Sequence, residues 1–209
     1  MPLFYQHNIN ETTKLAVWHI LESEEYFLQW VPLQKEITHW HKRLQHLAGR
    51  YLLQYLFPGF PYHLILIADT RKPYLPGEEF HFSISHCGDY AAVIVSKDKR
   101  VGVDIELITP KVEKIKHKFL NEIELLPLKT SVDRAEYNSL QQLTLLWCCK
   151  EAVFKWYGNG AVDFRKDINL QPTFDIATGC MKGEFTKETR QSLNITFKLF
   201  EGMCLAWIS

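Results

Sequence analysis

The stretch VGVDIEL, residues 101–107, alternates apolar and polar side chains. Such alternation predicts a β-strand with one apolar face. The opposite face carries two carboxylates, Asp104 and Glu106, which a strand places roughly 7 Å apart. Like charges on one face of a strand repel each other. Either water screens the pair, as on the solvated face of many strands, or a cation lies between the two carboxylates.

The size and composition of the chain exclude several classes of protein. Its 209 residues suit one domain or two small halves that share a core, and 46% hydrophobic residues allow that core to be sizeable. The 24 basic residues balance the 24 acidic ones, so the totals do not indicate a nucleic-acid-binding protein. We see no signal peptide at the N-terminus and no apolar run long enough to span a membrane. Five cysteines without a CxxC pair favour a reducing, cytoplasmic location over a disulfide or zinc framework.

Hydrophobic periodicity predicts the clearest helix at residues 37–57. One of its stripes is apolar and is expected to face the core. A second stripe, beside the first, is basic. The apolar stripe contains Trp40, Leu44, Leu47, Tyr51 and Tyr55, and the basic stripe contains Arg43, His46 and Arg50.

The remaining segments follow in the order strands, helices, strands. Residues 13–30 mix helical and extended signals. Further along the chain we expect a buried strand at 62–68, a loop at 69–79, a hairpin at 80–96, helices at 112–128 and 136–157, and mostly strands at 161–209. This order predicts an α+β fold, and the short connections favour antiparallel sheets.

Two further segments contain polar groups that bear on the role of the strand carboxylates. In LLWCCKEAVFKWYGNG, residues 145–160, Glu151 and Lys155 are four positions apart on the predicted helix, the favourable order for a surface ion pair. Trp147 lies one turn earlier and is expected to pack in the core. In FSISHCGDY, Ser85 and His86 stand near the predicted turn, where polar groups can contact a ligand.

Taken together, these segments resemble a known family. RKPYLP, FSISHCGDYAAV, VGVDIELI, KFLNEIE and WCCKEAVFKWYGNG occur in the order of the motifs of the Sfp-type 4'-phosphopantetheinyl transferases, across residues 71–160. Each motif alone is weakly specific, but five in order are strongly specific. The sequence departs from the family pattern at Arg71, where glycine is usual, and at Cys87, where serine or threonine is common.

The resemblance implies an activity and a metal. The reaction would transfer 4'-phosphopantetheine from coenzyme A to a serine of an apo acyl or peptidyl carrier protein and release 3',5'-adenosine bisphosphate. Asp104, Glu106 and Glu151 would bind Mg²⁺, or alternatively Mn²⁺, since such hard ions prefer carboxylate and phosphate oxygens. The metal would neutralise charge on the phosphoanhydride during cleavage.

The resemblance also assigns catalytic roles. A serine hydroxyl needs a general base, and Glu151 is the first choice. Glu124 is the alternative, although a carboxylate at the start of a helix also interacts favourably with the helix dipole. Lys155 would contact the transferring phosphate and stabilise its growing negative charge.

Binding of coenzyme A would use basic residues in the first half of the chain. Lys72, Pro73, Ser85 and His86 match family positions that contact coenzyme A. The family places an arginine for the 3'-phosphate on its first long helix, but the aligned residue here is Gln45. Arg43 and Arg50 are therefore both candidates, and a solvated helix face is the alternative for the basic stripe. Lys35 is the nearest match to the upstream lysines of the family.

The family fold is α+β with two similar halves, each a small antiparallel sheet packed with a long helix, related by a pseudo-twofold. The resemblance implies halves at 1–102 and 103–209, with the site at their interface, and a monomer. The sequence itself contains no repeat. Two other functions stay open: a Mg²⁺-dependent nucleotide phosphohydrolase, and a non-catalytic protein that binds coenzyme A or a carrier protein. No nucleic-acid or membrane partner is expected.

Overall fold

The computed structural model describes residues 2–33, 36–130, 139–171 and 177–209. The chain divides into two compact units, Met1–Ile105 and Glu106–Ile208, and the boundary falls within strand β7 (Gly102–Leu107). Each unit combines helices with an antiparallel sheet, which confirms the predicted α+β class. The pseudo-twofold relation between similar halves stays a prediction. Among the described residues, no helix is both long and apolar enough to cross a membrane.

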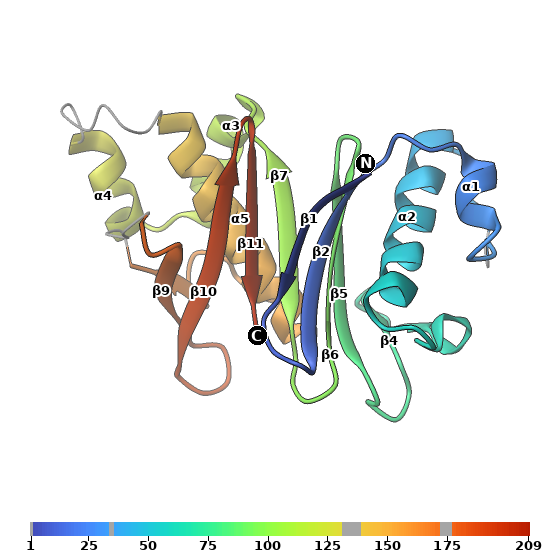
Figure 1. The fold of residues 1–209 in the computed structure, drawn as a ribbon. Helices are drawn as coiled ribbons and strands as arrows, with labels where there is room; N and C mark the ends of the chain where they lie inside the picture. Colours follow the sequence, from blue (N-terminus) through green and yellow to red (C-terminus); the bar gives the residue numbers. More distant parts are fainter. Residues whose placement is uncertain (1, 34–35, 131–138, 172–176) are drawn as a thin grey trace. The chain divides into compact units, whose positions relative to one another are not determined.

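The first unit is built on a four-stranded sheet in the order β1-β2-β6-β5, with all neighbours antiparallel (Figure 1). A separate two-stranded ribbon pairs β3 with β4. The elements are β1 (Leu3–Asn8), β2 (Thr13–His19), α1 (Glu24–Leu28), α2 (Trp40–Leu56), the 3-10 turn η1 (Tyr62–Leu64), β3 (Leu66–Ile67), β4 (Pro73–Tyr74), β5 (His81–Cys87) and β6 (Tyr90–Ser96).

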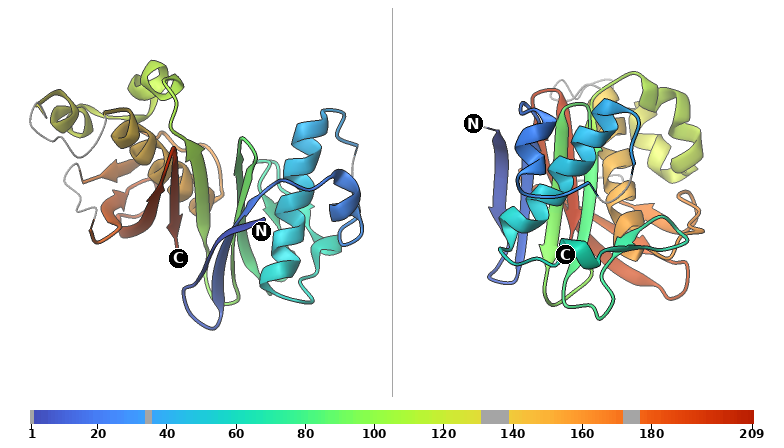
Figure 2. Two further views of the ribbon diagram at one scale, coloured as in Figure 1. Left: turned by 45° about the horizontal axis from the view of Figure 1, so that its top comes forward. Right: turned by 90° about the vertical axis from the view of Figure 1, so that its right-hand side faces the viewer.

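Helix α2 covers one face of the four-stranded sheet, with α1 packed beside it (Figure 2). The approach is close at Gly49, because a Cβ atom there would lie 2.9 Å from Cγ2 of Ile84 on β5. A larger residue at position 49 would push α2 away from β5. The helix therefore presents its neighbouring side chains directly to β5.

The second unit is built on a five-stranded sheet in the order β7-β11-β10-β9-β8. Helix α5 packs against β8, β10 and β11, and α3 packs against α5. The elements are α3 (Lys111–Phe119), α4 (Glu122–Thr130), α5 (Ser139–Tyr157), β8 (Ile168–Leu170), β9 (Cys180–Phe185), β10 (Gln191–Phe200) and β11 (Met203–Ile208). The predicted helix at 112–128 is thus two helices, and residues 136–138 of the next predicted helix lie outside the described residues.

The core-facing side of α2 contains only part of the predicted apolar stripe: Leu47 is buried, and Leu44 and Tyr51 pack against the core. Trp40 is 64% exposed and Tyr55 is 39% exposed. The side of the helix that contains Gly49 also rests on the sheet, and it buries Ala48, Leu52, Leu53 and Leu56. Arg50, which the sequence pattern assigned to a basic stripe beside the apolar one, is also buried in this orientation of the helix.

The prediction of a buried strand at 62–68 is wrong. Residues Tyr62–Leu64 form a 3-10 turn, and only Leu66–Ile67 pair, with β4. The side chains of β3 are about half exposed, at 49% for Leu66 and 52% for Ile67. The apolar composition predicted burial, but β3 belongs to a small ribbon and not to the main sheet.

Candidate active site

Asp104 lies on β7 and is only 2% exposed, so it does not belong to a solvated strand face. The hydroxyl of Ser85 donates a hydrogen bond to Oδ1 of Asp104 at 2.7 Å. The same hydroxyl accepts one from the backbone N–H of Ile105 at 3.4 Å. Ser85 is itself buried within β5 and not at the turn. The serine therefore holds one oxygen of the Asp104 carboxylate.

Glu106 lies two residues further along β7, and its carboxylate accepts a hydrogen bond from a side chain of α5. The indole N–H of Trp147 donates to Oε1 of Glu106 at 3.0 Å. The Trp147 ring packs against Phe119, with ring centroids 4.9 Å apart, and stacks on Phe164 at 5.6 Å. Trp147 therefore packs as predicted, and in addition it orients a carboxylate, which the sequence pattern did not predict.

Glu151 and Lys155 follow Trp147 on α5 at steps of four residues. Residues four apart share one face of a helix. Because Trp147 contacts Glu106, this face of α5 is the one directed toward the end of β7. Both Glu151 and Lys155 are partly exposed, so they remain accessible to a ligand.

Glu124 and Lys150 form a buried ion pair in the second unit, at 2.8 Å, with side chains 1% and 0% exposed. Oε2 of Glu124 also accepts from the backbone N–H of Asn121, and Oε1 accepts from the N–H of Leu170. The side chain of Asn121 in turn accepts from the N–H of Glu124, which completes a capping box at the start of α4.

Lys150 is enclosed by backbone carbonyls as well as by Glu124. Its Nζ lies 2.7–2.8 Å from the carbonyl oxygens of Phe119, Phe164 and Ile168. Burial lowers the pKa of Lys150, against the opposing effect of the Glu124 carboxylate. The pair joins α4, α5 and the start of β8 at one buried point.

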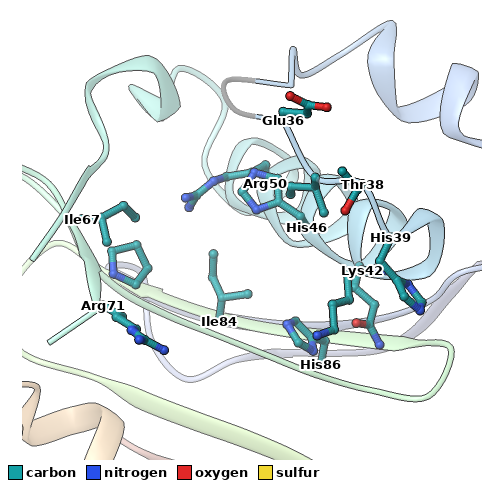
Figure 3. A pocket seen from close by; sticks show the side chains of 13 residues that line it. Glu36, Thr38, His39, Lys42, His46, Arg50, Ile67, Arg71, Ile84 and His86 are labelled. Carbon is teal, nitrogen blue, oxygen red and sulfur yellow. The ribbon is translucent and has the colours of Figure 1, made fainter.

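A pocket of about 980 Å³ lies in the first unit, between α2, the β3–β4 ribbon and β5 (Figure 3). Its apolar wall is formed by Ile67, Pro73 and Ile84. Cationic or imidazole side chains dominate the rest of its lining, with Glu36 as the one carboxylate among the described lining residues. The basic members are His39, Lys42, His46, Arg50, Arg71 and His86.

Arg50 is the most deeply buried cation of the pocket, at 7% exposure. Its Nε and Nη1 have no hydrogen-bond partner within the part of the chain that the structure describes. Burial lowers its pKa to about 10, so the guanidinium is still charged at neutral pH. A buried, charged group without partners is costly unless a ligand supplies them.

Arg43, the other candidate on α2, has partners within the first unit. Its guanidinium contacts the carboxylate of Glu24 at 2.7–2.8 Å and donates to the carbonyl oxygen of Ile37 at 3.1 Å. Gln45, which aligns with the arginine of the family, donates to the carbonyl oxygen of Gly88. Of the two arginines predicted as candidates, only Arg50 lines the pocket.

Of the other ligand contacts predicted in the first unit, two line the pocket, whereas Lys72 and Ser85 are not among its lining residues. Pro73 and His86 line it. Lys72 lies between the two lining residues Arg71 and Pro73, and burial, together with the nearby positive charge of Arg100, lowers its pKa to about 8. Lys35 lies outside the described residues. The sequence pattern did not single out Lys42 or the side chain of Arg71, because only the ribbon fold brings them to the same pocket.

The predicted metal ligands are all carboxylates, which suits a hard divalent ion. Within the described residues, no group of three or more His, Cys, Asp or Glu side chains is gathered closely enough to hold a metal ion. Asp104 and Glu106 each accept a hydrogen bond that orients the carboxylate. Such outer contacts commonly orient metal ligands, and carboxylate oxygens are the donor type that Mg²⁺ prefers.

Basic pockets and oriented carboxylates are both typical of proteins that bind phosphorylated ligands, the first through the phosphate charges and the second through a divalent ion. Comparison with known proteins defines the class further. Residues 100–197 match the 4'-phosphopantetheinyl transferase superfamily. This part of the chain is therefore similar to that superfamily, which agrees with the resemblance of its sequence motifs.

Individual relatives agree with this assignment. Enterobactin synthase component D of Escherichia coli O157:H7 is 37% identical over 87 residues, which cover 40% of this chain and 41% of that protein. The 4'-phosphopantetheinyl transferase AcpT of the same organism is 30% identical over 132 residues, covering 62% and 65%. The 4'-phosphopantetheinyl transferase gsp of Aneurinibacillus migulanus is 31% identical over 116 residues, covering 54% and 46%. The match thus spans less than two thirds of each of these relatives.

Proposed function

We propose that this protein transfers 4'-phosphopantetheine from coenzyme A to a serine of an apo acyl or peptidyl carrier protein and releases 3',5'-adenosine bisphosphate. The observation that supports the proposal is the match of residues 100–197 to the 4'-phosphopantetheinyl transferase superfamily. That segment contains the four residues to which the motifs assign the chemistry: Asp104, Glu106, Glu151 and Lys155.

The pocket under α2 would bind the nucleotide end of coenzyme A. Its apolar wall suits the flat adenine base, and its basic lining suits the phosphates. We assign the 3'-phosphate to Arg50, because this buried guanidinium lacks partners among the described residues whereas Arg43 is paired with Glu24. His86, Lys72 and Pro73 would contact the rest of the nucleotide, and Ser85 supports the site through Asp104.

Asp104, Glu106 and Glu151 would hold Mg²⁺, or Mn²⁺ in its place, together with phosphate oxygens of the substrate. When bound, the ion supplies positive charge to the phosphoanhydride. Ser85 and Trp147 would keep the carboxylates of Asp104 and Glu106 in the correct orientation.

Glu151 would accept the proton of the carrier serine, directly or through water. Glu124 is a poorer base, because its carboxylate is 1% exposed and accepts three hydrogen bonds inside the second unit. A base must come within hydrogen-bond reach of the proton that it removes. Lys155 would donate to the transferring phosphate and stabilise its charge in the transition state.

The test is a panel of apo carrier proteins incubated with coenzyme A and Mg²⁺ and analysed by mass spectrometry. The expected result is a phosphopantetheine mass increase on the carrier serine, and its loss in Asp104→Asn. Asparagine keeps an oxygen to accept the hydrogen bond from Ser85, so the fold should be retained. Hydrolysis of nucleotides without any carrier would instead identify a phosphohydrolase, and binding of coenzyme A without transfer to any carrier would identify a binding protein.

A further inference from the structure

The loop between β3 and β4 carries an arginine at a position where its geometry favours glycine. The N–H of Arg71 donates to the carbonyl of Ala68 at 2.8 Å, and the N–H of Ala68 donates to the carbonyl of Lys72 at 2.9 Å. These bonds close a tight hairpin whose last loop residue, Arg71, has a φ of 66°. Glycine is the usual residue at such a left-handed position, so arginine strains the backbone.

The side chain of this strained residue lines the pocket under α2. Figure 3 shows Arg71 and Arg50 reaching the pocket from different elements, the β3–β4 ribbon and α2. Arg50 is buried, and its Nε and Nη1 have no partner among the described residues. Arg71 is exposed at the rim. The pocket therefore offers two guanidinium groups at separate positions on its wall.

We propose that Arg71 is a specificity-determining residue that binds the 5'-phosphate side of the nucleotide, while Arg50 binds the 3'-phosphate. Glycine would relax the turn but would remove this cation from the rim. The strained conformation is retained because the guanidinium contributes to ligand binding. The pocket then selects nucleotides that are phosphorylated at both positions over those with a single phosphate. The inference rests on the proposed function, since it concerns the ligand of the same pocket.

Calorimetry with three nucleotides tests the assignment without any catalytic step. The probes are 3',5'-adenosine bisphosphate, adenosine 5'-monophosphate and adenosine 3'-monophosphate. Arg71→Gln should weaken binding of the bisphosphate and of the 5'-monophosphate about tenfold or more, and should leave the 3'-monophosphate within about twofold of wild type. Arg50→Gln should show the opposite pattern. Equal losses for both monophosphates in Arg71→Gln would indicate a general charge effect and would overturn the assignment.

Thermal unfolding tests the strain separately. Arg71→Gly should raise the melting temperature by about 2–4 °C while it weakens the bisphosphate as Arg71→Gln does. The matched control is Glu78→Gly, because Glu78 also has a positive φ of 54° but does not line the pocket. It should raise the melting temperature similarly and leave nucleotide affinity unchanged. A melting temperature that falls in Arg71→Gly would contradict strain at this residue.

The remaining outcomes separate this inference from the proposed function. Arg71→Lys should recover part of the affinity lost in Arg71→Gln, because the cation returns without the planar guanidinium. If wild-type protein binds the bisphosphate and Arg71→Gln binds it within about twofold, only the role of Arg71 is overturned. If wild-type protein binds none of the three nucleotides, the proposed function fails as well.

Discussion

The guanidinium of Arg50 is buried and charged, and its Nε and Nη1 have no hydrogen-bond partner among the described residues. Most buried polar groups in proteins are hydrogen-bonded, and the exceptions require an explanation. The exception here lies in a pocket whose other basic residues would also attract phosphate. Arg43, seven residues earlier on the same helix, is an arginine whose partners lie within the protein. The two residues therefore offer a matched comparison.

Arg50→Gln should abolish most of the preference for coenzyme A over dephospho-coenzyme A, which lacks the 3'-phosphate. Loss of one charge-assisted contact should weaken coenzyme A roughly tenfold or more and leave dephospho-coenzyme A nearly unchanged. Calorimetry with both ligands measures the ratio. Arg43→Gln should keep the wild-type preference. If Arg43→Gln removed the preference and Arg50→Gln did not, our assignment of the 3'-phosphate would be reversed.

Lys72 should make ligand binding depend on pH in a range where most lysines do not titrate. Burial, and then the charge of Arg100, lowers its pKa to about 8. Only the protonated amine attracts phosphate, so affinity for 3',5'-adenosine bisphosphate should fall as pH rises from 7 to 9. Lys72→Met should bind more weakly at pH 7 and show a flatter pH profile. A wild-type affinity that stays constant over this range would contradict the low pKa.

At the scale of elements, α4, α5 and β8 meet at the Lys150–Glu124 pair. Neither side chain of this pair reaches solvent, so the pair stabilises the packing of these three elements. The capping box of Asn121 fixes the start of α4 around the same carboxylate. This arrangement places Lys150 in the interior, so that the next residue, Glu151, lies on another side of α5.

Glu124→Gln should therefore reduce stability, because it leaves the Lys150 ammonium buried without a counter-charge. Removing one partner of a buried pair costs about 3–5 kcal/mol, measurable by urea unfolding. Glu151→Gln should keep near wild-type stability and lose transfer activity by about 10²-fold or more. A Glu124→Gln protein with wild-type stability and a strongly reduced kcat would favour Glu124 as the base instead.

The sequence predicted elements best where local pattern and motif agreed. The strand at 101–107, the hairpin at 80–96 and the helix around 40–56 were all predictable from periodicity and turn residues. The core face of α2 was predicted only in part, because Gly49 allows β5 to approach a side of the helix that lies outside the predicted apolar stripe. The contact of Trp147 with Glu106 joins residues 41 positions apart, and no local pattern encodes such a pairing.

At the scale of the whole molecule, the α+β class followed from the order of the elements, and the resemblance to the superfamily followed from five ordered motifs. The candidate site residues followed from the same motifs, but their burial and their partners within the fold did not. Glu124 and Glu151 are both acidic residues on predicted helices, and only burial distinguishes them. Arg43 and Arg50 are both basic residues on α2, and only their partners distinguish them.

Binding of coenzyme A should stabilise the whole chain in a metal-dependent way. A ligand at one hundred times its Kd stabilises the folded state by about 2.7 kcal/mol, which corresponds to roughly 5–10 °C in melting temperature for a chain of this size. We expect coenzyme A alone to raise the melting temperature through the pocket under α2. Added Mg²⁺ should raise it further, because the ion would join the substrate phosphates to Asp104, Glu106 and Glu151.

Asp104→Asn separates the two contributions. It should keep the increase caused by coenzyme A alone, since Asp104 does not line the pocket, and should lose the further increase caused by Mg²⁺. Arg50→Gln should show the complementary result, with a smaller increase from coenzyme A in the absence of metal. Mg²⁺ without coenzyme A is the control and should change the melting temperature little, because the phosphates complete the ligand set. An equal increase in Mg²⁺ and in excess chelator would contradict the assignment of these carboxylates to a metal ion.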